Sequence, residues 1–275
     1  MKNILVPTDF SSCSNAASDM ALALARQAKA EIHFMHIMVT PVAWAQLPKQ
    51  KEKNFPETVK AIGRARGSLL ALEERARKAG LRAEHFLVFD ETNDEILRHL
   101  KHYHHDFIVM GSHGKKGVRD VLLGSNARKM MRHARSPVLV VKRPVKEFKV
   151  RDVVFASDFG KESEKALSAA LDLIKLTGAK LHLVFVNTPG LFEESHVTIP
   201  RMKRLAAACP KDAVLAIVNA RRVQRGIDMY TAEVNAGLII MCTSGRGGVK
   251  RMLQPSVAEA VARSSDIPVL IVKVK

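Results

Sequence analysis

The sequence predicts a tandem α/β protein in which two similar units each fold around a parallel sheet. Short apolar, β-branched runs alternate with longer stretches of helical spacing, the strand candidates are apolar almost throughout, and the chain repeats its own pattern. Apolar strands that alternate with helices are typical of a parallel sheet covered on both faces. The sequence therefore favours this class over an all-helical or all-β protein.

The first half of the chain supplies the clearest elements. Ser11 or Ser12 is placed to cap a helix over 14–30, and Gly80 is placed to end a helix over 68–80. We also expect a helix over 125–134. Prolines and charges are frequent over 40–67, so we expect this segment to be an exposed loop that leads into a helix. The strand candidates are 3–7, 31–37, 106–111 and 137–142.

An internal repeat defines the domain organisation. Asp9 corresponds to Asp158, 149 residues later, whereas Ser125 corresponds to Ser256, 131 residues later. The second copy is therefore 18 residues shorter in its middle. We expect one domain over 1–144 and a second over 149–275.

Composition limits the classes of function. The chain has 275 residues, of which 47% are hydrophobic, and a formal net charge of +17, which favours anionic partners. Aromatic residues are only 5% and no basic run is interleaved with them, so nucleic acid is disfavoured as a partner but stays an alternative. We expect a cytoplasmic protein without a membrane span, because no apolar run reaches the required length and three cysteines at unrelated spacings suit reduced thiols.

A glycine-rich stretch follows the strand candidate at 106–111. In parallel sheets, ligands bind beyond the carboxyl ends of strands at the point where strand order reverses. Gly111 and Gly114 permit close approach of the backbone, and Gly124 precedes a helix whose first amides are free to donate to an anion. The alternative is that these glycines only form tight turns. Neither a standard P-loop nor a dinucleotide fingerprint after the first strand is present.

Three separated motifs resemble the universal stress protein family: "ILVPTDFS", "MGSHGKKGVRDVLLGS" and "SPVLVVK". The second motif matches that family's ATP-binding pattern, G-x2-G-x9-G-[ST], through Gly111, Gly114, Gly124 and Ser125. The resemblance implies two tandem Rossmann-like domains of the adenine nucleotide alpha hydrolase-like type, each with a five-stranded parallel sheet. It implies that the last strands of the two copies pair within the chain, and it leaves association into a homodimer open.

The resemblance also implies roles for individual residues and a ligand, ATP, with Mg²⁺ on its phosphates. Asp9 would bind adenine or ribose, Ile37 and Met110 would lie against the adenine region, and the glycine-rich stretch would hold the ribose and phosphates. Ile37 and Met110 fit the core of the domain equally well. The full set is Pro7, Thr8, Asp9, Ile37, Met110, Gly111, Ser112, His113, Gly114, Gly124, Ser125 and Asn126.

The second copy departs from the motif. Cys242 replaces Gly111 and Pro255 replaces Gly124, and proline has no N–H to donate. We therefore expect a degenerate nucleotide site in the second domain. Cys242 is also the better of two candidates for a redox-sensitive thiol, the other being Cys13; for both, we favour ordinary packing.

The expected function is a nucleotide-dependent switch or sensor in stress response, read by an unidentified protein partner. The alternatives are a slow ATPase and a nucleotide-free scaffold for an apolar ligand. No nucleophile elbow or paired acid and base is identified, so we assign no catalytic residue. The stretch "RHLKHYHH" places four histidines (His99, His102, His104 and His105) within seven residues; we favour a solvated helix end there, with a metal site as the alternative.

Overall fold

The computed structural model describes residues 1–90, 95–113, 123–144, 148–244 and 255–274. The first half contains β1 (Asn3–Pro7), α1 (Ser12–Ala28), β2 (Glu31–Val39), the short 3-10 helix η1 (Trp44–Gln46), α2 (Lys49–Glu52), α3 (Pro56–Lys78), β3 (Ala83–Asp90), α4 (Glu95–His102), β4 (Phe107–Gly111), α5 (Ser125–His133) and β5 (Val138–Val141). The second half contains β6 (Asp152–Ala156), α6 (Lys161–Thr177), β7 (Lys180–Asn187), α7 (Ser195–Ala206), β8 (Val214–Asn219), α8 (Val223–Glu233), β9 (Leu238–Ser244), α9 (Pro255–Ser264) and β10 (Val269–Val274).

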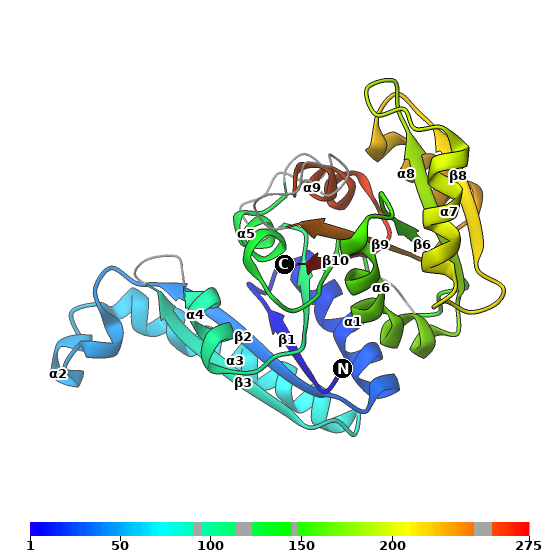
Figure 1. The fold of residues 1–275 in the computed structure, drawn as a ribbon. Coiled ribbons are helices and arrows are strands. Elements are labelled where there is room, and N and C mark those ends of the chain that lie inside the picture. The colour runs from blue at the N-terminus through cyan, green and yellow to red at the C-terminus, as the bar shows by residue number, and fades with distance from the viewer. Residues whose placement is uncertain (91–94, 114–122, 145–147, 245–254, 275) are drawn as a thin grey trace.

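The strands form a single ten-stranded sheet in the order β3-β2-β1-β4-β5-β10-β9-β6-β7-β8. Each half contributes five parallel strands with the same internal order, and this confirms the tandem α/β fold class (Figure 1). In the first half the order reverses between β1 and β4, which pair directly. The carboxyl ends of these two strands are therefore the expected place for a ligand.

The two halves join through their last strands. β5 and β10 pair antiparallel, and Leu139 and Leu270 lie opposite each other with no exposed surface. The pairing within the chain that the resemblance implies is thus present. It turns two small sheets into one continuous sheet and removes an exposed edge from each half.

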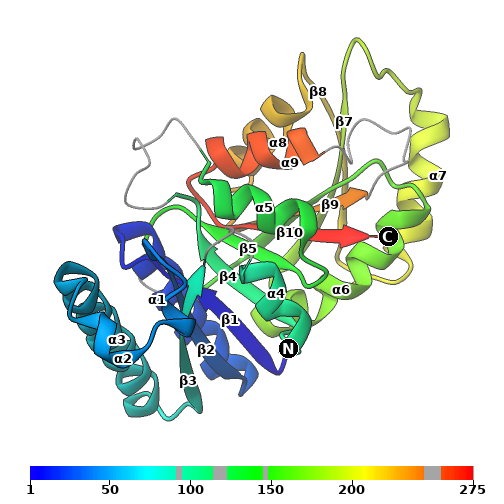
Figure 2. The same ribbon diagram turned by 90° about the vertical axis from the view of Figure 1, so that its left-hand side faces the viewer.

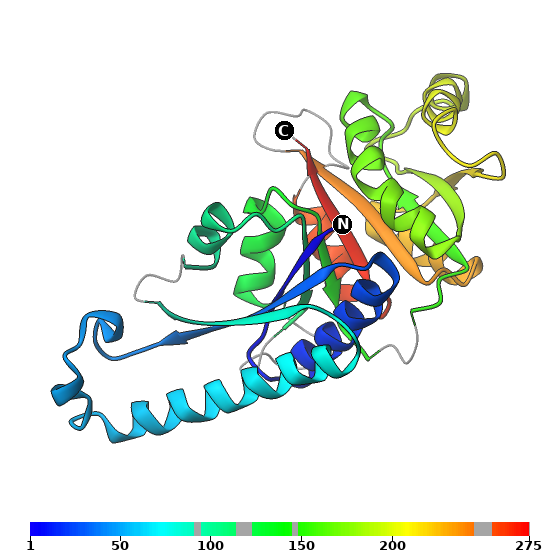
Figure 3. The ribbon, with the colours of Figure 1, turned by 90° about the horizontal axis from the view of Figure 1, so that it is seen from below.

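Helices cover both faces of the sheet. The helices α4, α5, α8 and α9 lie on one face, and α1, α3, α6 and α7 lie on the other (Figure 2, Figure 3). The core is dominated by the strand residues, and the side chains of Ile4, Leu5 and Val6 in β1 are fully buried. This burial on both faces explains why the strands read as nearly continuous apolar runs.

Helix α1 begins where the sequence indicated. Ser11 is its N-cap and its side chain accepts a hydrogen bond from the amide of Ser14, which satisfies one of the free donors of the first turn. The preceding residue, Phe10, has a positive φ of 61°, and its counterpart Phe159 has a φ of 56°. Left-handed backbone is uncommon for a bulky residue, so both halves retain the same sharp turn between the first strand and the first helix.

The segment 40–67 is more helical than the sequence analysis expected. It contains η1 and α2, and α3 begins at Pro56, a residue that fits the first turn of a helix because it needs no amide donor there. Trp44 is buried against the rings of Phe55 and Phe89. This part of the chain extends away from the rest of the molecule (Figure 1, Figure 3). Among the described residues, no helix has the length and apolarity that a membrane crossing requires.

Candidate functional site

A cavity of about 570 Å³ opens at the carboxyl ends of β1, β2 and β4. Ten of the twelve residues expected at the site line this cavity, although they come from four separate stretches of the chain. They are Pro7, Thr8, Asp9, Ile37, Met110, Gly111, His113, Gly124, Ser125 and Asn126. The cavity lies where the strand order reverses, as it does for ligands of open parallel sheets.

One described residue of the expected set, Ser112, does not line the cavity. Ser112 is buried, with 3% of its surface exposed, and its hydroxyl lies 3.0 Å from Nδ1 of His113. The backbone carbonyl of Ser112 accepts a hydrogen bond of 2.8 Å from the amide of Gly124. Ser112 therefore holds the start of α5 against the end of β4. Gly114 lies outside the described residues.

The amino end of α5 is open toward the cavity. Its N-cap is Gly124, which has no side chain to cap the helix, so the amides of the first turn at Ser125, Asn126 and Ala127 lack an intrahelical acceptor. The Gly124 amide, which precedes these amides, donates to the carbonyl oxygen of Ser112. Unpaired amides together with the helix dipole make this end suitable for an anion.

The turn after β1 supplies the carboxylate of the site. Oδ1 of Asp9 accepts a hydrogen bond from the amide of Ser11 at 3.1 Å, which fixes the side chain at the cavity wall. The hydroxyl of Thr8 lies 3.2 Å from that of Ser14 and accepts from the amide of Phe10. Asp9 is the only carboxylate among the described residues that line the cavity.

The close approach of β4 to α1 explains the glycine at position 111. A Cβ added there would lie 2.9 Å from the backbone carbonyl carbon of Cys13 and 3.0 Å from the amide nitrogen of Ser14. Sγ of Cys13 donates to the carbonyl oxygen of Lys142 at 3.1 Å and lies 3.3 Å from Nε2 of His113. Burial raises the pKa of Cys13 despite these contacts, which favours a packing role for this thiol.

Several cavity residues were missed by the sequence analysis: Ser14, Met35, His36, Ile96, Leu123, Ala127 and Arg128. Met35 and His36 adjoin Ile37 in β2, and Arg128 is three residues after Ser125 on α5, so strand and helix periodicity could have indicated them. Ile96 comes from α4, and no local signal in the sequence connects that helix with the glycine-rich stretch.

In the corresponding region of the second half, the described polar side chains are buried. Asp158 is only 6% exposed, and its Oδ1 accepts from the amide of Gly160 at 3.0 Å. The hydroxyls of Ser157 and Ser163 lie 2.6 Å apart. Sγ of Cys242, where the first half has Gly111, lies 3.6 Å from the Ser157 hydroxyl. The first half has equivalent contacts at Asp9 and Thr8, so the halves differ in the deeper burial of Asp158 and in the Cys242 side chain at the position of Gly111.

Cys242 does not have the properties of a redox-sensitive thiol. It is 1% exposed, and burial raises its pKa to about 12. Reactive cysteines need an accessible thiolate, which this environment suppresses. Its surroundings therefore favour the ordinary packing that the sequence also favoured.

The histidines of "RHLKHYHH" divide into two groups. His102 and His104 are exposed, but His99 and His105 are 8% and 6% exposed, so the expected solvated helix end is wrong for these two. Nε2 of His105 lies 2.8 Å from Nδ1 of His33, and burial lowers the pKa of both His99 and His105 to about 4. Within the described ranges, no group of three His, Cys, Asp or Glu side chains is arranged to hold a metal ion.

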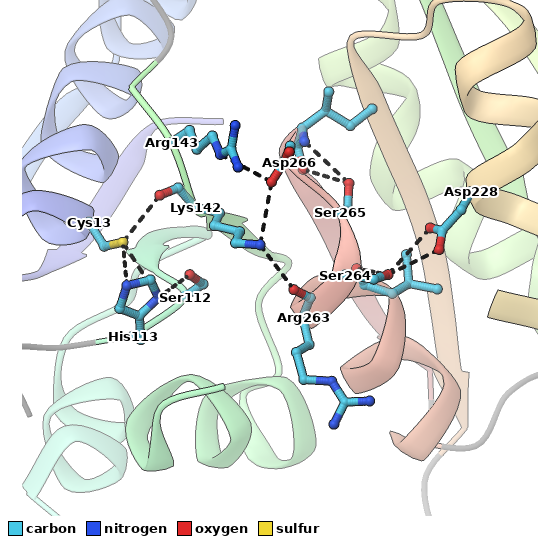
Figure 4. A network of polar contacts seen from close by, with 12 residues as sticks. Cys13, Ser112, His113, Lys142, Arg143, Asp228, Arg263, Ser264, Ser265 and Asp266 are labelled. Carbon is cyan, nitrogen blue, oxygen red and sulfur yellow. Dashed lines mark hydrogen bonds and ion pairs between the residues drawn. The ribbon is translucent and has the colours of Figure 1, made fainter. Parts of the chain in front are cut away.

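A continuous set of polar contacts runs from the glycine-rich stretch to the second half (Figure 4). The backbone carbonyl of Lys142 accepts a hydrogen bond from the thiol of Cys13. The side-chain Nζ of Lys142 lies 3.3 Å from Oδ1 of Asp266. Nε of Arg143 lies 3.1 Å from the same oxygen. Nearby, Nε of Arg132 on α5 donates to Oε1 of Glu259 on α9 at 2.5 Å. The element that begins at the cavity is therefore tied directly to the other half.

Comparisons with known proteins agree with this architecture. Universal stress protein MJ0531 of Methanocaldococcus jannaschii is 32% identical over 148 residues, which are 53% of this chain and 85% of that protein. A crystal structure of a universal stress protein from Archaeoglobus fulgidus matches with a TM-score of 0.76 and 25% identity, covering 98% of both chains. Protein PA1789 of Pseudomonas aeruginosa shares the fold, with a TM-score of 0.69, 16% identity and coverage of 99% of this chain and 92% of its own.

A family model supports both halves separately. The model described as the universal stress protein family matches residues 1–142 and again residues 149–273. The two matches together span nearly the whole chain, and they coincide with the two five-stranded halves of the sheet. The chain therefore belongs to the universal stress protein family, as a tandem member.

Proposed function

We propose that the first domain binds ATP in the cavity at the ends of β1, β2 and β4, and that the bound nucleotide acts as a switch in stress response. One observation carries the proposal: ten residues expected from a sequence motif and from separate loops line a single cavity. Its volume, about 570 Å³, falls within the range of roughly 300–1,000 Å³ that is usual for small-molecule sites.

The chemistry of the walls suits the parts of a nucleotide. Apolar side chains from β2 and β4, among them Ile37 and Met110, offer a surface for the base, and Asp9 offers an acceptor for adenine or ribose hydroxyls. The amides of Ser125 and Asn126 at the start of α5 suit the phosphates. Mg²⁺ fits as a companion of the phosphates, because it commonly keeps several waters and binds through substrate phosphate oxygens with few protein ligands.

The second domain serves as a structural partner without a nucleotide of its own. Asp158, the counterpart of Asp9, is buried and engaged by Gly160 and Ser163. Cys242 stands at the position of Gly111, and its side chain is buried beside Ser157. A signal from the cavity would reach this domain through α5 and the pair of Arg132 and Glu259, where a protein partner could detect it.

Isothermal titration of the full chain with Mg·ATP tests the proposal. We expect one ATP per chain, and release of adenine nucleotide when protein purified without added ATP is denatured. Asp9→Ala should abolish binding, whereas Asp158→Ala, the matched change in the second half, should leave the stoichiometry at one. Binding of two ATP per chain, or loss of binding in Asp158→Ala while Asp9→Ala still binds, would contradict the assignment. Circular dichroism checks that both variants are folded.

A further inference from the structure

Arg128 is a cation of the cavity that the family motif does not include. It lies in the first turn of α5, three residues after Ser125, and lines the cavity with its side chain exposed. Its guanidinium makes no ion pair or hydrogen bond with any residue in the described part of the chain. Among the described cavity residues it is the only lysine or arginine.

The surroundings of Arg128 show that its charge is not used to hold the two halves together. One turn later on the same helix, Arg132 is paired with Glu259 of α9. Glu259 is also the residue that corresponds to Arg128 in the second half, 131 positions later. The same helical position therefore carries a positive charge beside the cavity of the first half and a negative charge, engaged at the interface, in the second.

The phosphates of a bound triphosphate would need more positive charge than the rest of the described cavity wall supplies. A triphosphate carries several negative charges, the amino end of a helix supplies only about half a positive charge, and Asp9 adds a negative charge at the cavity wall. Arginine stays protonated, and its planar donors match phosphate oxygens in a forked geometry. An unpaired arginine at this place therefore supplies the compensation that backbone amides alone do not.

The topology places Arg128 at the phosphate end of the proposed ligand. The strands run in the order β2-β1-β4, so Ile37 at the end of β2 and Asp9 after β1 lie toward one side. Helix α5 follows β4 on the other side, and Arg128 is the fourth residue from its open amino end. A base near Ile37 would direct the end of the phosphate chain toward α5.

We propose, on the basis of ATP binding in the first domain, that Arg128 sets the preference of the cavity for nucleotides with longer phosphate chains. Arg128 contacts the β- and γ-phosphates of ATP and has no contact with the nucleoside. The cavity consequently binds ATP more tightly than AMP, and the difference depends on this one side chain. Because the guanidinium is exposed, the difference in affinity between ATP and AMP becomes smaller as the salt concentration rises.

The test compares ATP, ADP, AMP and inorganic tripolyphosphate on the full chain at fixed ionic strength by calorimetric titration. Arg128→Gln is the test variant and Arg128→Lys retains the charge without the fork. Arg135→Gln is the matched control, because Arg135 is also exposed and without an ion pair among the described residues but does not line the cavity. Thermal unfolding confirms that the variants fold.

We expect Arg128→Gln to weaken ATP and tripolyphosphate about tenfold while AMP changes less than twofold. Arg128→Lys should recover part of the loss, and Arg135→Gln should match the parent. Equal losses for ATP and AMP, or no loss for ATP, would overturn the role of Arg128 and leave ATP binding standing. If the parent binds tripolyphosphate through Arg128 but neither ATP nor AMP, the nucleotide proposal fails and the phosphate contact survives.

Discussion

The Cα of Gly111 lies so close to the backbone of Cys13 that a Cβ would come within 2.9 Å of the Cys13 carbonyl carbon. This contact brings the end of β4 against the start of α1, and both elements form walls of the cavity. Gly111 is thus required by packing. In the second half, Cys242 occupies the same position and its side chain is buried beside Ser157.

Gly111→Ala is expected to destabilise the protein by about 1–3 kcal/mol, because the backbone of Cys13 cannot yield as a flexible side chain would. Urea unfolding measures the change. Gly63→Ala is the matched control, since a Cβ there meets nothing within 4 Å in the interior of α3. The control should gain about 0.5–1 kcal/mol. Equal stability of the Gly111→Ala variant and the parent would contradict the packing requirement.

A second prediction concerns acid stability. His99 and His105 are buried with pKa values lowered to about 4, chiefly by burial, whereas an unfolded histidine titrates near 6.5. Between these values the unfolded chain binds more protons than the folded one, so stability should fall as pH drops from about 6.5 to about 4. Each histidine contributes a slope of about 1.4 kcal/mol per pH unit. Above pH 7 the two histidines add no slope.

The measurement is the urea midpoint at several pH values between 7.5 and 4.5. His99→Phe should lower the slope of stability against pH by the contribution of one histidine. Phenylalanine can occupy the place beside Phe86 and Tyr103, and it does not titrate. His104→Gln, at an exposed position, should keep the slope of the parent. An unchanged slope in His99→Phe would show that the acid sensitivity arises elsewhere in the molecule.

A third prediction concerns the thiols. Cys242 is buried and its pKa is raised to about 12, whereas Cys209 is only half-buried. Alkylation by iodoacetamide of the folded protein at pH 8 should therefore modify Cys209 well before Cys242. Peptide mass spectrometry measures the two rates, and the urea-unfolded protein provides the control in which the rates converge. Modification of Cys242 as fast as Cys209 in the folded state would mean that the second half opens readily.

The sequence was sufficient for the parts of the fold that local patterns encode. The apolar strands, the cap at Ser11 and the repeat predicted two parallel units, and the glycine spacing indicated Gly111, Gly124 and Ser125 together. These features depend on residues near one another in the chain or on a repeated motif. A general rule of parallel sheets indicated a crevice at the ends of the strands, and the pairing of β1 with β4 brings Asp9 to it.

Contacts between residues far apart in the chain could not be predicted from the sequence. Nothing near Arg132 indicates Glu259, 127 residues away, and nothing near Ser112 indicates that its carbonyl takes the amide of Gly124. The burial of His99 and His105 was missed because a run of histidines reads as polar, whereas their neighbours in space are His33, Phe86 and each other. These contacts and the burial of the two histidines depend on tertiary packing, which local sequence patterns do not indicate.

The last prediction concerns the joint between the two halves. Leu139 of β5 and Leu270 of β10 face each other across the only antiparallel pair of strands in the described sheet, and both are fully buried. Leu270→Ala should cost about 2–5 kcal/mol through lost burial and the cavity that remains. Asp266→Asn, which weakens the nearby ion pairs of this half-exposed carboxylate with Lys142 and Arg143, should cost less than about 1 kcal/mol.

Denaturant unfolding followed by both tryptophan fluorescence and circular dichroism distinguishes these outcomes. Trp44, the single tryptophan, reports the first half, whereas circular dichroism reports the helices of both. Because one sheet runs through both halves, we expect the two signals to change together in the parent and in Leu270→Ala, with an earlier midpoint in the variant. If fluorescence keeps the midpoint of the parent while circular dichroism shifts, the halves unfold independently and β5–β10 pairing does not couple them.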